Sequence, residues 1–286
     1  MRKWLVFIVL LGLLWIRTAF AAPTLSVMPE TILQGDPMFV TVENALPLKE
    51  ILFDGKNFPF FIYDGKPRAF IGIDLREKPG DYELSARFAD GETLTKIVTV
   101  TAREKIEAPL GIPQKLGGDT PASQKNLVDS LTKENQSLSE IRTGKKAFWT
   151  APFRFPVKYP FVTDTYGYNR KTGEYTIPHK GTDFRAEEGT RVRAMNRGVV
   201  RIARSYRVYG KTIVVDHGLG LLTFSMHLSK IKVNEGELVL PGQVIGLSGK
   251  TGYAEQPHLH VSVRINGTSI DPIKFLDLFA PNSSGQ

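Results

Sequence analysis

The residues of this chain with the clearest chemical potential are its histidines, which all lie in the second half of the sequence. The five are His179, His217, His227, His258 and His260. Residues two apart in a β-strand project to the same face, and the stretch QPHLHVSV has the composition of a strand. It therefore predicts that the imidazoles of His258 and His260 lie side by side.

A second candidate pair lies in the stretch IPHKGTDF. His179 and Asp183 are an even number of residues apart, so they can share one face of an extended segment. Pro178 and Gly181 disfavour a helix there, and Gly181 leaves room for another group to approach. Two imidazoles and one carboxylate are ligands that a catalytic zinc ion takes from protein, with a further position open to water.

One imidazole of the HLH stretch is thus expected to complete a metal site with His179 and Asp183, and the spacing leaves open which one. The other would lie beside the metal, facing His227 from a neighbouring strand. A zinc-bound water has a pKa of about 7 and attacks a carbonyl that the metal polarises, while nearby imidazoles orient the water and stabilise charge. The pattern predicts hydrolysis of an amide without a covalent intermediate.

Other chemistries fit the sequence poorly. The chain has no cysteine, which excludes thiolate catalysis and disulfides. The stretch GLSGKTG lacks both the nucleophile-elbow pattern and the Walker spacing. His217, which precedes a turn-forming GLG, is interpreted as structural and left out of the site.

The elements around these residues are predicted to be mostly β-strands. Residues 22–103 contain seven short runs of β-type residues, with turn signals every 8 to 12 residues, which predicts an immunoglobulin-like β-sandwich. This part has no histidine, so we expect an accessory role. Residues 148–280 return to glycine-rich strands and are expected to form a second, nearly all-β domain, followed by a tail over 281–286.

A linker over residues 104–147 is expected to contain one amphipathic helix. Thr120 and Pro121 provide a cap and a first turn, and the helix should run to about Ile141. Its apolar residues follow heptad spacing, with Glu134 interrupting the seam: Leu127, Leu131, Leu138 and Ile141. The helix is expected to pack on one of the two domains, and we hypothesise that it or the sandwich covers the site and keeps the protein latent.

The first residues predict export. Arg2 and Lys3 precede an apolar run over residues 4–16, and RTAFAA follows with an A-x-A arrangement, which is typical of a secretory signal peptide over 1–21. The apolar run is too short to span a bilayer, so no stable membrane anchor is expected after cleavage. The formal net charge of +8 suits an anionic partner such as a cell-wall polymer.

The C-terminal part resembles the lysostaphin/LytM-type peptidoglycan endopeptidases, which are zinc metallopeptidases of family M23. The resemblance runs from about Val162 to Ile273 and rests on stretches in the family's order, among them HKGTDFRAEEGTRVRA, IVVDHGLGLLT, MHLSKIKVNEGELVLPGQVIGLSGKTG and PHLHVSVRINGTSIDP. It implies a LytM-type antiparallel β domain with a zinc groove.

By this resemblance, one Zn²⁺ per chain would be held by His179, Asp183 and His260, and His227 and His258 would be the catalytic histidines beside it. The chain departs from the family pattern at Ser225, where a tyrosine is common, and at Gln256, where a glycine is common. It also has a longer segment over residues 169–178, which we expect to border the substrate groove.

The function implied is a secreted zinc endopeptidase of the periplasm or cell wall that cuts peptide cross-links or stem peptides of peptidoglycan. Direct cross-links of a Gram-negative wall are the favoured target, wall-associated or divisome-type regulators are candidate partners, and no nucleic-acid partner is expected. The alternative is a non-enzymatic LytM-like activator or wall-binding module, which the complete set of candidate ligands disfavours. A third interpretation is an adhesive or toxin-like sandwich protein with a vestigial C-terminal domain.

Overall fold

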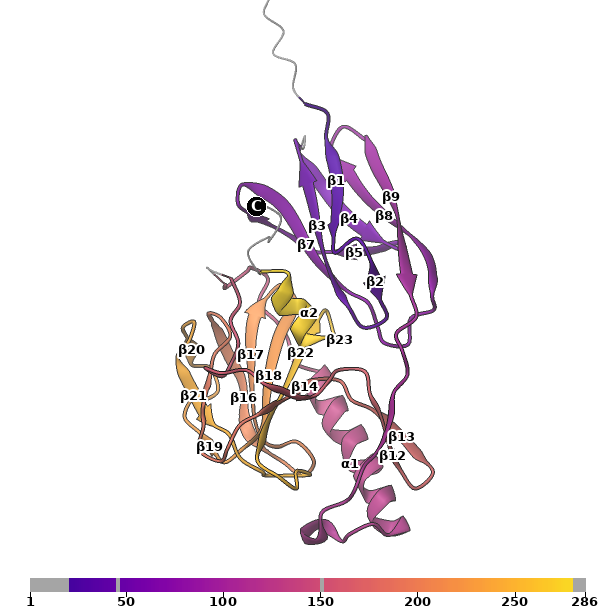
Figure 1. Cartoon of the computed structure of the whole chain (residues 1–286). Helices are drawn as coiled ribbons and strands as arrows, with labels where there is room; N and C mark the ends of the chain where they lie inside the picture. Colours follow the sequence, from indigo (N-terminus) through magenta and orange to yellow (C-terminus); the bar gives the residue numbers. More distant parts are fainter. Residues whose placement is uncertain (1–20, 45–46, 150–151, 280–286) are drawn as a thin grey trace, which may run out of the picture.

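A computed structural model describes residues 21–44, 47–149 and 152–279, and shows two β-rich domains stacked end to end, with one long helix against the second (Figure 1). The chain is therefore mostly β, as predicted. The expected signal peptide lies outside the described residues apart from Ala21, as does the tail 281–286.

The N-terminal domain consists of two sheets that enclose a core of aliphatic and aromatic side chains. Their strand orders are β1-β3-β7-β6 and β2-β9-β8-β4-β5. Each of the seven predicted runs overlaps a strand, and β2 and β5 were missed because they are only two and three residues long. The strands are β1 (Thr24–Met28), β2 (Ile32–Leu33), β3 (Pro37–Glu43), β4 (Leu48–Phe53), β5 (Lys56–Phe58), β6 (Phe60–Tyr63), β7 (Lys66–Gly72), β8 (Gly80–Phe88) and β9 (Thr93–Thr101).

The C-terminal domain is built on one large sheet with the order β11-β14-β22-β18-β17-β16-β20, and β23 pairs with β22. A small sheet, β15-β21-β19, is also part of this domain. The elements are β11 (Val162–Asp164), β14 (Thr182–Arg185), β15 (Arg191–Arg193), β16 (Gly198–Tyr206), β17 (Gly210–Gly218), β18 (Leu221–Leu228), β19 (Lys230–Ile231), β20 (Leu238–Val239), β21 (Val244–Leu247), β22 (His258–Ile265), β23 (Thr268–Ile270) and helix α2 (Pro272–Asp277).

The linker has more structure than its composition indicated. Strand β10 (Glu107–Pro109) pairs in parallel with β12 (Asn169–Thr172), which forms a hairpin with β13 (Tyr175–Pro178). The pairing of β10 was not predicted. It depends on the unpaired edge of the β12–β13 hairpin, which is distant from β10 in the sequence. A short 3₁₀ turn (Gln114–Leu116) follows β10.

The predicted linker helix is present as α1 (Pro121–Ser139). The side chain of Thr120 accepts a hydrogen bond from the backbone N–H of Ser123, and Pro121 occupies the first turn, where its missing N–H costs nothing. The helix ends two residues before Ile141, which still packs beside Leu138. No helix in the described part of the chain is long and apolar enough to cross a membrane.

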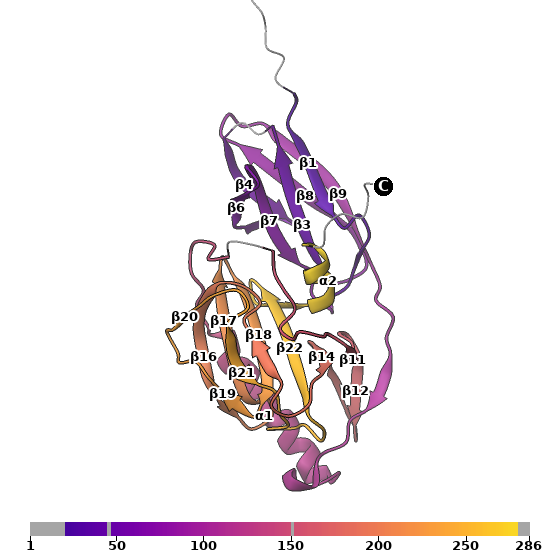
Figure 2. The same cartoon turned by 60° about the vertical axis from the view of Figure 1, so that its left-hand side comes forward.

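The two faces of the large sheet pack against different partners. On β22, Leu259 and Val263 belong to the main core of the domain, whereas His260, Ser262 and Arg264 point to the opposite face, following the period of two. We call this opposite face the site face. Helix α1 lies against it, because Leu138 packs on residues of β16, β17 and β18 (Figures 1 and 2).

Aromatic side chains join the two domains. Phe39 projects from β3 away from the N-terminal core and shares a cluster with Phe70, Trp149 and Phe153. The N-terminal domain is therefore packed on the end of the second domain that carries α2.

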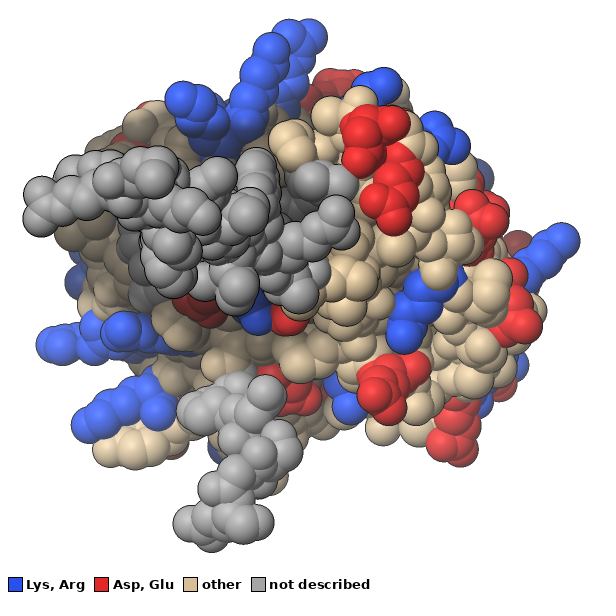
Figure 3. All heavy atoms as spheres, turned by 90° about the horizontal axis from the view of Figure 1, so that it is seen from above, with Lys and Arg blue, Asp and Glu red and all other residues tan. Residues whose placement is uncertain are grey.

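Seen from above, the surface carries interspersed basic and acidic side chains rather than one basic patch (Figure 3). The charged side chains in view are therefore of both signs.

Candidate metal centre

Two neighbouring strands place the candidate ligands. Strands β14 and β22 are antiparallel, and Asp183 and His260 are direct register partners. Directly opposed residues on paired strands point to the same face. His179 lies at the bend between β13 and β14, and a Cβ at Gly181 would come within 2.4 Å of His260 Nε2. The glycine is required for this close approach, as the sequence predicted.

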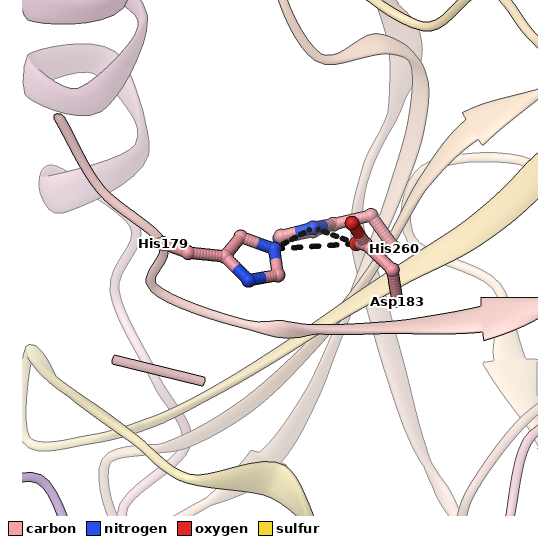
Figure 4. Close-up of side chains that lie close together, drawn as sticks. All are labelled: His179, Asp183 and His260. Carbon is pink, nitrogen blue, oxygen red and sulfur yellow. Dashed lines mark hydrogen bonds and ion pairs between the residues drawn. The ribbon is translucent and has the colours of Figure 1, made fainter. Parts of the chain in front are cut away.

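One potential metal-ligand atom from each of His179, Asp183 and His260 lies at this point, and all three side chains are buried (Figure 4). His179 Nε2 lies 3.2 Å from Asp183 Oδ1 and 3.1 Å from His260 Nδ1, and His260 Nδ1 lies 2.7 Å from Asp183 Oδ1. These are the three residues predicted to hold the metal, and the structure brings them together.

Hydrogen bonds on the outer sides of the two imidazoles fix where their protons lie. His179 Nδ1 donates to the carbonyl of Thr165 at 2.8 Å. The Ser262 hydroxyl donates to the carbonyl of Lys180 at 2.6 Å. Because that hydroxyl proton is already used, His260 Nε2 must be the donor in its 3.0 Å hydrogen bond with Ser262 Oγ. Burial lowers the pKa of His260 to about 4, so its ring is neutral. In the tautomers that these outer hydrogen bonds select, the ring nitrogens that face Asp183 are the ones without a hydrogen.

In these tautomers three acceptor atoms converge, and a cation would offset their mutual repulsion. Two neutral imidazoles and a carboxylate, each oriented by a hydrogen bond on its outer side, are the donor set and the surroundings of a catalytic zinc site. The residues present thus fit a zinc ion.

Arg170 holds the carboxylate in place. Its NH2 group donates to Asp183 Oδ2 at 2.7 Å and also contacts Asp164. Burial would lower the pKa of Arg170, but the two carboxylates outweigh it and raise the pKa, so the guanidinium stays charged. This leaves the other oxygen of Asp183, Oδ1, directed at the histidines.

The remaining two histidines of the prediction lie next to the cluster. The ring centroids of His227 and His258 are 4.9 Å apart, and those of His227 and His260 are 6.0 Å apart. His227 Nδ1 donates to the carbonyl of Thr251 at 2.9 Å, so Nε2 is its free acceptor. Burial, with His258 and His260 nearby, lowers the pKa of His227 to about 3. Its φ of 60° is uncommon for a non-glycine residue, and such strain clusters at functional sites.

His217 lies apart from the cluster. Its Nδ1 donates to the carbonyl of Arg197 at 2.8 Å, and its Nε2 accepts from the hydroxyl of Thr223 at 2.9 Å. Both nitrogens are satisfied by protein groups within a fully buried environment, which is a structural role.

His217 also predicts a loss of stability in acid. Burial lowers its pKa to about 4, whereas an unfolded histidine has a pKa of about 6.5. Between these values the unfolded chain binds a proton that the folded chain does not, so the free energy of unfolding falls as the pH drops through this window, by about 3 kcal/mol at most. Urea unfolding at pH 7, 6, 5 and 4 measures this. His217→Gln should show a shallower slope, and equal slopes for both proteins would contradict the assignment.

Ser262 predicts a measurable change in metal affinity. In Ser262→Ala the Nε2–H of His260 loses its acceptor, so the ring is no longer held in the ligating tautomer, and we expect a 10- to 100-fold weaker zinc affinity. Competition with a fluorescent chelator measures it. Ser225→Ala on β18 is the matched control, because among the described residues the Ser225 hydroxyl orients none of the three ligands, and its affinity should be unchanged.

A cavity of about 290 Å³ lies against the cluster. Its lining includes His179, His227 and His260, and its charged side chains are all basic: Arg170, Lys180 and Arg264. The hairpin β12–β13, which is the long segment noted in the sequence, contributes residues 176–178 to this lining. Helix α1 closes it with five residues: Leu127, Val128, Leu131, Thr132 and Asn135.

Several of these contributors were not predicted from the sequence. Arg170 lies 13 residues from Asp183 on a hairpin that was flagged only for its length. Ser262 follows His260 by two residues, so the period of two places it on the same face, and that signal was available. The carbonyls of Thr165 and Thr251 act through the backbone, which residue types do not reveal.

Comparisons with known proteins agree with this geometry. Residues 177–272 match the profile of Peptidase family M23. The peptidoglycan DD-endopeptidase ShyA of Vibrio cholerae is 42% identical over 97 residues, 34% of this chain and 23% of that protein. The DD-carboxypeptidase/endopeptidase Mpg of Neisseria meningitidis is 36% identical over 119 residues, 41% of this chain and 27% of that protein. The chain thus spans about a quarter of the length of these relatives.

A solved structure extends the similarity beyond the matched segment. A crystal structure of a protein assigned to peptidase M23 from Pseudomonas aeruginosa covers 85% of this chain and 94% of its own, with a TM-score of 0.64 and 28% identity. Both the converging ligand set and the similarity fall in the same part of the molecule. Residues 177–272, which match the profile of Peptidase family M23, thus contain all three converging residues.

Proposed function

We propose that this protein is an exported zinc endopeptidase that hydrolyses peptide cross-links or stem peptides of peptidoglycan. The observation that carries the proposal is the convergence of His179 Nε2, Asp183 Oδ1 and His260 Nδ1 beside two further imidazoles. The relatives named as peptidoglycan DD-endopeptidases support the substrate class.

His179, Asp183 and His260 would hold the zinc ion, which would supply an activated water and polarise the scissile carbonyl. The neutral ring of His227 presents Nε2 as an acceptor, so it can orient a water and take its proton. The ring of His258 is more exposed, with 21% of its side chain accessible, and is placed to exchange a proton with the substrate. Arg170 holds Asp183 in position, which keeps the acceptor set preorganised.

We further infer that the groove is the space between the site face and α1, and that α1 keeps the protein latent. The helix lies directly over the cavity that borders His227 and His260, so a peptide chain could reach them only after α1 moves. The N-terminal sheets, which we interpret as an immunoglobulin-like accessory domain, pack at the far end of the C-terminal domain and leave this face to α1.

The test is incubation of the full chain with purified peptidoglycan, with a zinc chelator, and with zinc restored after chelation. Mass spectrometry of the soluble products should show new free amino termini and no new reducing sugar ends, and chelation should stop their release. Release of sugar-cleaved fragments, or release that a chelator leaves unaltered, would contradict the proposal. Bound zinc with no hydrolysis from a chain whose helix has been displaced would favour the non-enzymatic alternative.

A further inference from the structure

Helix α1 contacts the groove through a one-sided set of hydrogen bonds. The carboxylate of Glu134 accepts from the backbone N–H of Val208 at 2.9 Å and from that of Tyr209 at 3.2 Å. The amide oxygen of Asn135 accepts from the hydroxyl of Tyr209 at 3.0 Å. In these contacts α1 supplies acceptors, and the groove supplies donors.

Arg264 belongs to the same set of donors. Among the described residues, its NH1 and NH2 groups donate only to α1, to the carbonyl of Leu138 at 3.2 Å and to Asn135 Oδ1 at 3.3 Å, and its Nε is buried without a partner. Its guanidinium stacks on Phe224 at 4.6 Å, and no carboxylate of the described chain forms an ion pair with it. A buried guanidinium without a carboxylate is unfavourable, which indicates that its partner comes from outside the fold.

Burying the carboxylate of Glu134 costs free energy that an apolar side chain at the same position would not. Glu134 occupies a position of the α1 seam between Leu131 and Leu138 and is 8% exposed. An apolar side chain there would continue the seam, whereas a buried carboxylate needs hydrogen bonds to offset its lost hydration. The two N–H groups of Val208 and Tyr209 supply them, so this point of the groove already binds a carboxylate.

The Val208 and Tyr209 donors adjoin His227, and Arg264 lies further along the site face. The carbonyl of Tyr209 accepts from the backbone N–H of His227 at 3.0 Å. The loop whose N–H groups bind the carboxylate of Glu134 is therefore hydrogen-bonded directly to His227. Arg264 shares a strand and a face with His260, four residues along β22, or about 13 Å at the rise of an extended strand. A peptide bound across the metal centre would meet both.

We propose that the N–H groups of Val208 and Tyr209, with Arg264 alongside, form a carboxylate-binding subsite of the groove that Glu134 of α1 occupies in place of the substrate. The subsite selects peptides with a free carboxylate near the bond that is cut. This inference rests on the proposed function for the identity of the natural ligand, whereas the affinity of the subsite for carboxylates can be measured separately.

The first test uses acetate as the probe and needs no catalysis. In Glu134→Ala the two N–H groups lose their acceptor, and a small carboxylate can take its place. Acetate should raise the unfolding temperature of this variant and shift the amide NMR signals of Val208 and Tyr209, whereas acetamide should do neither. Glu134→Gln, which keeps one acceptor oxygen, is the folded reference. Equal responses to acetate and acetamide in Glu134→Ala would overturn the proposal.

The second test uses two cross-linked peptides that differ only in a free or amidated carboxylate. The Glu134→Ala chain, with α1 also displaced by Leu127→Asp, should show a kcat/KM for the free acid about tenfold above that for the amide. Adding Arg264→Gln should bring the ratio close to one, while Arg264→Lys keeps part of it. A ratio unaffected by Arg264→Gln would contradict the role of Arg264. Failure to cut either peptide would count against the proposed function, and the acetate result would still decide the subsite.

Discussion

Replacing His179 with alanine is expected to remove bound zinc and to lower peptide hydrolysis by at least about a thousandfold, because the activated water depends on the metal. Among the described residues, His179 Nε2 is one of three protein atoms that converge on the site. Its loss leaves two ligands, which is one fewer than catalytic zinc sites have. Zinc per chain, from plasma mass spectrometry, and the initial rate of peptide release are the two readouts.

The matched control is His217→Gln. Both ring nitrogens of His217 form hydrogen bonds with groups outside the cluster. This variant should retain one zinc per chain. If His179→Ala kept its zinc, or if His217→Gln lost it, the assignment of the ligands would be wrong. Far-ultraviolet circular dichroism of both variants separates a loss of metal from a loss of fold.

Displacing α1 is expected to raise activity by roughly ten- to a hundredfold. Leu127 is 1% exposed and packs against Ile112 and Val208, and burying a leucine contributes about 1.5–3 kcal/mol. Leu127→Asp removes this contribution and adds a charge that is costly to bury, so the population with α1 displaced grows by about tenfold for each 1.4 kcal/mol. The rate of peptide release from the full chain is the measurement.

Ser137→Asp provides the control, since it adds the same charge to an exposed position of α1. Its rate should equal that of the unaltered chain. An unaltered rate for Leu127→Asp, in a protein that remains folded and loaded with zinc, would show that α1 does not restrict access. Faster limited proteolysis within residues 121–139 would confirm that the helix has been released.

The convergence of His179, Asp183 and His260 was partly predictable, because residues two apart in a strand share one face. The period of two placed His258 and His260 on one strand, and the structure adds that Asp183 is the register partner of His260. Which of the two imidazoles completes the ligand set came from the family resemblance and not from spacing. The structure is consistent with His260, since it lies 2.7 Å from Asp183 whereas His258 Nε2 lies 3.9 Å from it.

The relation of α1 to the site could not be predicted from the sequence. Heptad spacing identified an amphipathic helix, but periodicity states only that one face is buried and not what buries it. Glu134 was interpreted as an interruption of the seam, whereas in the structure it is the residue that binds Val208 and Tyr209. Contacts between residues more than 70 positions apart depend on tertiary packing, which local patterns do not encode.

The most direct test of the central claim is mass spectrometry of the products that the Leu127→Asp chain releases from purified peptidoglycan, with the double variant Leu127→Asp/His179→Ala as the blank. We predict chelator-sensitive release of peptides with new free amino termini from the single variant and none from the double variant. Equal release from both, or products cut only in the sugar strands, would contradict a zinc endopeptidase whose groove is closed by α1.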